Sequence, residues 1–179
     1  MRFTKLRLRC LFWFVLLIVC GAISFAARTQ TKSDGATSFA GKPGRETTQK
    51  YATWMSRVPD ERPLSQLSIP GTHDTCALRN GASFGFAKCQ SWSLEDQLEA
   101  GIRFIDIRCR HVGDRFHIYH GIVDQKMTFA KVQEVCRTFL KGHPTECIVM
   151  SVKEEHKPAN NSQSFEKTFA AETLSLIHI

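Results

Sequence analysis

At residues 102–108 the chain reads IRFIDIR. This stretch is short, rich in isoleucine, and preceded by Gly101. Because β-branched and aromatic residues favour extended backbone, we predict a strand here. Asp106 and Arg108 lie at its C-terminal end, so the predicted strand ends in charged side chains.

Helices and strands alternate on both sides of this stretch. Upstream, Ser93 has the character of an N-cap, with Asp96 three residues later, and Gly101 closes the helix. Further predicted elements are strands at 67–69, 116–120 and 147–152, and a helix that Thr128 caps and that runs to Leu140. The strand at 147–152 is nearly continuously apolar, as when both faces of a parallel strand are covered. This order predicts an α/β fold with a parallel sheet and crossover helices.

Candidate catalytic side chains follow the predicted strands. They are His73 and Asp74, Asp106 and Arg108, His120, and Lys153. In parallel α/β barrels the carboxyl ends of the strands converge at one mouth, which holds the active site. One histidine can take a proton from an attacking hydroxyl, a second can protonate a leaving oxygen, and an arginine can neutralise charge on phosphorus. This set therefore suits cleavage of a phosphodiester.

Four ordered motifs carry a resemblance to a known family. They are SIPGTHDT at 68–75, FIDIR at 104–108, YHG at 119–121 and IVMSVK at 148–153. Together they resemble the X domain of the bacterial-type phosphatidylinositol-specific phospholipases C, over roughly Tyr51 to Glu155. The resemblance implies a TIM-type (β/α) barrel and a phosphoric diester hydrolase, or phosphorus-oxygen lyase, that acts on inositol lipids.

The resemblance also implies a role for each matching residue. His73 is then the general base on the inositol 2-hydroxyl, and His120 is the general acid on the glycerol oxygen. Diacylglycerol leaves and a cyclic inositol phosphate forms. The remaining implied roles are those of Asp74 as carboxylate partner of the acid, Arg108 on the phosphate oxygens, Asp106 in orienting the site, and Lys153 on the inositol ring.

Arg108 bears on the metal requirement. In calcium-dependent relatives an acidic metal ligand stands at this position, so a guanidinium here implies that no metal and no cofactor is needed. The implied partner is phosphatidylinositol or a glycosyl-phosphatidylinositol anchor, met in transient contact at a membrane surface by a monomeric enzyme. The sequence does not discriminate between these two head groups.

Two other functions remain open. One is a catalytically idle barrel that binds inositol lipids. The other is a different barrel phosphodiesterase of the glycerophosphodiester type, for which Arg108 has the wrong charge for a metal ligand. Individual residues have plainer interpretations too: Asp106 could pair with Arg103 or Arg108, and Lys153 could be a solvated lysine. The five other histidines, His111, His117, His143, His156 and His178, match no catalytic position and are expected at the surface or in packing.

Residues 1–26 have the composition of a signal peptide. A basic start is followed by an apolar run and by small residues up to Ala26, after which we predict cleavage. The alternative is an uncleaved membrane anchor. Four basic residues of this segment belong to the formal net charge of +7, and without them the charge is about +3. That balance excludes a typical nucleic-acid-binding face. Residues 27–50 are predicted to be a flexible linker, and Asn160 begins a glycosylation sequon.

The predicted domain contains an odd number of cysteines, which are Cys76, Cys89, Cys109, Cys136 and Cys147. They form no CxxC motif and no Cys/His cluster with the spacing of a zinc site, which disfavours zinc. In an exported protein we expect one or two disulfides and one remaining thiol, with the pairing left open.

Length sets a further expectation. A closed barrel takes about 250 residues, so 51–179 would supply about half of one, a partial X domain. Since a half barrel leaves a strand edge unpaired, we expect the 179-residue chain to be inactive on its own. The residues after about Ala171 match nothing expected at that point and are given no weight.

Overall fold

The computed structural model describes residues 51–82 and 86–174. The predicted signal peptide (1–26) and linker (27–50) lie outside the described residues. In chain order the elements are η1 (Trp54–Arg57), η2 (Leu64–Gln66), β1 (Gly71–Thr72), α2 (Leu94–Glu99), β2 (Phe104–Val112), β3 (Arg115–His120), β4 (Val123–Thr128), α3 (Phe129–Gly142), β5 (Val149–Glu154) and α4 (Phe165–Leu174). Helices follow β1, β4 and β5, while β2, β3 and β4 are consecutive, and the predicted α/β class is confirmed.

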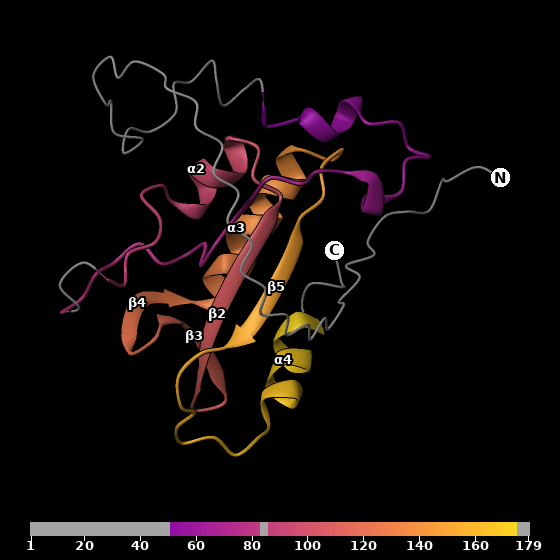
Figure 1. The fold of residues 1–179 in the computed structure, drawn as a ribbon. Coiled ribbons are helices and arrows are strands. Elements are labelled where there is room, and N and C mark those ends of the chain that lie inside the picture. The colour runs from indigo at the N-terminus through magenta and orange to yellow at the C-terminus, as the bar shows by residue number, and fades with distance from the viewer. Residues whose placement is uncertain (1–50, 83–85, 175–179) are drawn as a thin grey trace, which may run out of the picture. The chain divides into compact units, whose positions relative to one another are not determined.

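Strand β2 is the centre of the sheet. Two parallel neighbours flank it, as predicted: β1 pairs Gly71 with Phe104 on one side, and β5 on the other pairs along the strand from Phe104 to Cys109. Figure 1 shows β2 and β5 as the two long strands at the centre of the fold. The predicted strand at 102–108 thus exists and continues to Val112.

The strand predicted at 116–120 is antiparallel to β2, not parallel. Cys109 pairs with Ile118, and Val112 pairs with Arg115. The turn between them contains Gly113 (φ +59°) and Asp114 (φ +56°), and two residues with positive φ form the tight turn that joins antiparallel strands. β4, which the sequence did not suggest, extends this side of the sheet by pairing with β3.

Two other strand predictions need correction. Residues 67–69 form no strand, and the parallel pairing begins at Gly71. Just before it, the Pro70 carbonyl accepts hydrogen bonds from the amides of residues 103 and 104 (2.9 and 3.0 Å). β5 starts two residues later than predicted, and it is not covered on both faces, because the side chains of Ser151 and Lys153 are exposed.

The helix caps agree with the predictions. The Ser93 side chain accepts a hydrogen bond from the Asp96 amide, and the Thr128 side chain accepts one from the Lys131 amide. Gly101, at φ +100°, follows α2 as its predicted stop. Both helices therefore start where a hydroxyl satisfies a backbone amide that has no partner inside the helix.

The core lies on one face of the sheet. Ile105, Ile107 and Cys109 of β2 are buried against Val132 and Phe139 of α3, which Figure 1 shows running behind β2. Because side chains alternate along a strand, Asp106 and Arg108 belong to the opposite face. That face carries the polar side chains discussed below.

A buried ion pair anchors the N-terminal segment. Arg103 and Glu146 have fully buried side chains, with Nη2 of the arginine 2.8 Å from Oε2 of the glutamate. The same guanidinium donates to the carbonyls of Ala52 and Leu98 (2.6 and 2.7 Å). Arg103 is thus the structural partner of Glu146 and not of Asp106, one of the two pairings considered from the sequence.

The expected disulfides are not found. None of the five cysteines in the described residues is in a disulfide, and Cys76, Cys109 and Cys136 are packed in the hydrophobic core. Burial raises the pKa of the Cys109 thiol well above its ordinary value. These three therefore behave as small apolar side chains.

Two further observations concern packing and membranes. His111 is buried, lies 2.9 Å from Thr168 Oγ1 and packs on Phe116, which agrees with its predicted packing role. His178 lies outside the described residues. Within 51–82 and 86–174, each helix is too short or too polar to span a lipid bilayer.

Candidate active site

The site forms where β1 and β3 approach each other beside the middle of β2. His73 directly follows β1, and the next turn is fastened to β2 because the Thr75 amide donates to the Asp106 carbonyl (2.9 Å) and the Asp106 amide donates to Thr75 Oγ1 (2.8 Å). His120 ends β3, two residues after Ile118. The two histidines thus approach one stretch of β2 from opposite directions, and not from parallel strand ends as the sequence suggested.

His73 has a carboxylate on one ring nitrogen. Its Nδ1 lies 3.2 Å from Asp106 Oδ2 and 3.5 Å from Arg108 Nη2. The shorter contact, to a charged acceptor, favours a proton on Nδ1. That tautomer leaves the lone pair of Nε2 available, and the side chain is 65% exposed, so it can reach a bound molecule. Gln90 holds the loop in place by donating its Nε2 to the His73 carbonyl at 2.6 Å.

His120 contacts a backbone carbonyl on one side and a carboxylate on the other. Its Nδ1 is 2.9 Å from the Ala87 carbonyl, which fixes the proton on that nitrogen, and its Nε2 is 3.6 Å from Asp74 Oδ2. The imidazole is about a quarter exposed. A second proton on Nε2 would therefore sit between Asp74 and solvent, where a leaving group can accept it.

Asp74 is the most buried carboxylate of the site. Its side chain is 1% exposed, and neither of its oxygens has a hydrogen-bond partner among the described residues. Burial raises the pKa of Asp74, and the attraction of His120 and Arg108 opposes that shift only in part. Its backbone has a positive φ of 46°, an uncommon conformation for a residue other than glycine. The carboxyl thus has ion-pair contacts with Arg108 and His120, at 3.6 Å each, but no hydrogen bond within the part of the chain that the structure describes.

Arg108 lies among three carboxylates. Its guanidinium is 3.2 Å from Asp106, 3.6 Å from Asp74 and 3.7 Å from Glu155. Burial opposes its charge, but these three acids outweigh that effect and raise the pKa of Arg108. A guanidinium fixed in this way is a preorganised positive charge.

Glu155 belongs to the site, and the sequence analysis did not include it. Its Oε1 accepts a hydrogen bond from the Gly121 amide (2.9 Å), and its Oε2 lies 3.7 Å from both Arg108 Nη1 and Lys153 Nζ. It therefore connects the end of β5 to the turn that follows His120. The strand pairing could have indicated this position: when Lys153 lies opposite Arg108 in a parallel pair, residue 155 also lies at this end of the sheet.

Lys153 lies at the margin of the site. It is opposite Arg108 in the register, but its side chain is 61% exposed and forms an ion pair with Glu155. Of the six residues predicted from the sequence, five are joined by contacts below 4 Å, namely His73, Asp74, Asp106, Arg108 and His120. Lys153 joins them through Glu155.

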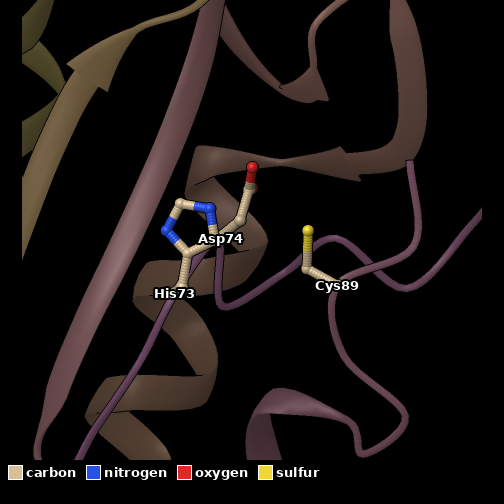
Figure 2. Close-up of side chains that lie close together, drawn as sticks. All are labelled: His73, Asp74 and Cys89. Atoms are coloured by element: carbon tan, nitrogen blue, oxygen red, sulfur yellow. The ribbon is translucent and has the colours of Figure 1, made fainter. Parts of the chain in front are cut away.

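Cys89 was also missed. Its Sγ lies 3.8 Å from His120 Nδ1, and ligand atoms of His73, Asp74 and Cys89 all lie within 4.8 Å of one another. Figure 2 shows the three side chains close together, with Cys89 on a separate stretch of chain. Nothing in the sequence pattern links residue 89 to the motifs, since it belongs to a loop of irregular structure.

The chain is similar to known proteins of one family. The family model for the phosphatidylinositol-specific phospholipase C X domain matches residues 61–175. A 1-phosphatidylinositol phosphodiesterase from Listeria monocytogenes is 42% identical over 117 residues, covering 63% of this chain and 35% of that protein. The enzyme of the same name from Staphylococcus aureus is 32% identical over 120 residues, covering 65% and 38%.

Solved structures give the same result for the fold. A variant of the phosphatidylinositol-specific phospholipase C from S. aureus superposes with a TM-score of 0.65 at 28% identity, covering 71% of this chain and 43% of that chain. For the L. monocytogenes enzyme the values are 0.57, 38%, 71% and 44%. The sheet thus corresponds to part of a phospholipase barrel, and the chain spans about two fifths of the length of its relatives. It belongs to the phosphatidylinositol-specific phospholipase C X-domain family.

Proposed function

We propose that the protein carrying this chain is a phosphatidylinositol-specific phospholipase C. It would cleave the phosphodiester of an inositol lipid, releasing diacylglycerol and a cyclic inositol phosphate. One observation carries this proposal: His73 is paired with Asp106 and His120 with Asp74, and the Arg108 guanidinium lies within 4 Å of both carboxylates. Two imidazoles with separate partners suit two proton transfers at one phosphorus.

The first transfer starts at His73. Its Nε2 takes the proton of the inositol 2-hydroxyl, and the resulting oxygen attacks phosphorus, closing a five-membered ring. Asp106, 3.2 Å from Nδ1, stabilises the imidazolium that forms. Arg108 faces the negative charge that develops on the non-bridging oxygens, where a fixed cation lowers the barrier most.

The second transfer ends at the glycerol oxygen. The bond from phosphorus to that oxygen breaks, and His120 supplies the proton from Nε2. Asp74, 3.6 Å away, favours the charged form of His120 before the transfer. Later attack of water on the cyclic product would return both histidines to their starting states.

Lys153 would bind the head group. Its exposed ammonium lies next to Glu155 at the edge of the site, where hydroxyls of an inositol ring can contact both. This role is a matter of binding, so replacement of Lys153 should change KM more than kcat.

Contact with the membrane would be made by two exposed apolar side chains near the site. Phe86 is 85% exposed and precedes Ala87, whose carbonyl contacts His120; Ile122 is 78% exposed and lies two residues after His120. Exposed side chains of this size favour a lipid interface, so they would direct the site toward the bilayer surface.

We also propose export of the protein through its first 26 residues. The basic and apolar pattern of that segment supports this, and so does the sequon, since Asn160 is exposed on the surface of the domain. A lumenal or extracellular enzyme would meet inositol lipids on the outer leaflet, either free or as protein anchors.

The decisive assay measures turnover of phosphatidylinositol in mixed micelles by the protein carrying this chain, in excess EDTA. We expect turnover to persist in EDTA, because Arg108 supplies the charge that a calcium ion would otherwise provide. The first product should be a cyclic inositol phosphate, because the inositol 2-hydroxyl is the attacking group. Lipid binding without turnover would instead indicate an idle barrel. Activity that EDTA abolishes would indicate a metal-dependent phosphodiesterase.

A further inference from the structure

Cys89 is held beside the catalytic groups by a built loop. The Ala77 carbonyl accepts hydrogen bonds from the amides of both Cys89 and Gln90 (2.9 and 3.0 Å), and the Gln90 side chain donates to the His73 carbonyl. These bonds join the loop to the turn after β1. The thiol is exposed, so it is accessible to a solute.

Three different donor types meet at this point. A ring nitrogen of His73, a carboxylate oxygen of Asp74 and Sγ of Cys89 lie within 4.8 Å of one another, and Figure 2 shows the three side chains close together. Within residues 51–82 and 86–174 no other group of three such side chains is this close. Ligands of one tetrahedral zinc ion are about 3.5 Å apart, given metal–ligand distances near 2.0 to 2.3 Å. The imidazole of His73 and the thiol of Cys89 are both exposed, so rotation of these two side chains would bring the donors closer together.

Asp74 supplies an independent reason for a cation here. Its side chain is 1% exposed, yet neither oxygen has a hydrogen-bond partner in the described part of the chain. Buried carboxylates in that condition are rare, and a bound ion is one of the few ways to satisfy them. Arg108 and His120 each lie 3.6 Å from Asp74, beyond hydrogen-bond distance, and Arg108 is shared with two further acids, Asp106 and Glu155. Three carboxylates, Asp74, Asp106 and Glu155, thus share the single guanidinium of Arg108, an arrangement that can accommodate a further cation.

We propose that His73, Asp74 and Cys89 form an inhibitory site for a zinc-like cation. The donor set of nitrogen, oxygen and sulfur selects zinc over calcium or magnesium, which prefer oxygen ligands alone. The site could not be predicted from the sequence, because the spacing of residues 73 and 89 matches no metal-ligand motif. The inhibitory role rests on the proposed catalytic function. The bound ion would occupy the base His73 and would neutralise the charge of Asp74 beside the acid His120.

Metal binding can be tested on the protein carrying this chain without reference to activity. The untagged protein is titrated with Co²⁺, whose thiolate charge-transfer absorption reports a bound sulfur, and the ion is then displaced with Zn²⁺. We expect one equivalent to bind, and Cys89→Ser to abolish the charge-transfer band and weaken binding about 10-fold or more. Cys147→Ser, which removes the other exposed thiol of residues 51–82 and 86–174, is the matched control and should keep the band. No band, or a band retained in Cys89→Ser, would overturn the proposal.

Inhibition is then measured on the protein carrying this chain. Phosphatidylinositol cleavage in the presence of Zn²⁺, Ca²⁺ or Mg²⁺ is expressed relative to each variant's own activity in EDTA. We expect Zn²⁺ alone to inhibit, with a midpoint at least 10-fold higher in Cys89→Ser. Equal zinc sensitivity of the two proteins would refute an inhibitory role for the site. Absence of cleavage in EDTA would refute the phospholipase function and leave the cobalt result standing.

Discussion

Arg108→Lys tests whether the guanidinium acts through its shape as well as its charge. In the structure its nitrogens reach three carboxylates, at 3.2 Å for Asp106, 3.6 Å for Asp74 and 3.7 Å for Glu155. A lysine ammonium is a single compact charge, so it cannot contact all three and still face a phosphate oxygen. Loss of one preorganised group of this kind costs about 3 to 4 kcal/mol of transition-state stabilisation, or roughly 10²- to 10³-fold in kcat.

The assay is the release of phosphorylated inositol from mixed micelles, with kcat and KM determined separately. We expect kcat to fall and KM to change little, because the charge acts mainly in the transition state. Arg110→Lys is the matched control: Arg110 lies two residues along the same face of β2, but it donates to the Lys157 carbonyl and lies over Tyr119. The reasoning fails if Arg108→Lys stays within threefold of the wild type, or if Arg110→Lys loses as much.

Three further predictions concern stability, pH and the membrane. Glu146→Gln should lower the free energy of unfolding in urea by about 3 kcal/mol, because it leaves the buried Arg103 charge unpaired, while a double apolar replacement of the pair should recover most of the loss. Because burial raises the pKa of Asp74 above 3.8, the folded state holds that proton more tightly, so this residue's contribution to stability is present at low pH and is lost as pH rises through the folded pKa. Asp74→Asn should remove the fall in unfolding free energy that the wild type shows as pH rises. If the difference in unfolding free energy between wild type and Asp74→Asn does not depend on pH, the prediction is contradicted. Replacing Phe86 and Ile122 by serine should reduce vesicle binding about 10-fold and leave turnover of a soluble inositol phosphodiester unchanged; equal losses on both substrates would argue against a membrane role.

Local chemistry made much of the fold predictable. The caps Ser93 and Thr128, the stop at Gly101 and the central strand are consequences of short-range hydrogen bonding and backbone preference, which act within a few residues. Strand direction is different, because alternation of side chains is the same in parallel and antiparallel strands. The Gly113-Asp114 turn contained the answer for β3, since two residues cannot make a parallel crossover.

The candidate site was predictable to the extent that motifs carry it. His73, Asp74, Arg108 and His120 were identified because each is embedded in a distinctive string. Glu155 and Cys89 were missed because their roles arise from pairing register and loop packing, which are long-range properties. The disulfide expectation failed for a related reason: cysteine count and compartment suggest bonds, but Cys76, Cys109 and Cys136 were placed in the core by their size and hydrophobicity.

The separate roles of the two histidines are best tested with a change of leaving group. Turnover of phosphatidylinositol is compared with turnover of an inositol phosphodiester that releases p-nitrophenol, which needs no proton to depart. We expect His120→Ala to lose about 10²- to 10⁴-fold on the lipid but less than about 10-fold on the activated substrate. His73→Ala should lose heavily on both. Equal losses of His120→Ala on the two substrates would contradict its assignment as the general acid, and with it the two-histidine account.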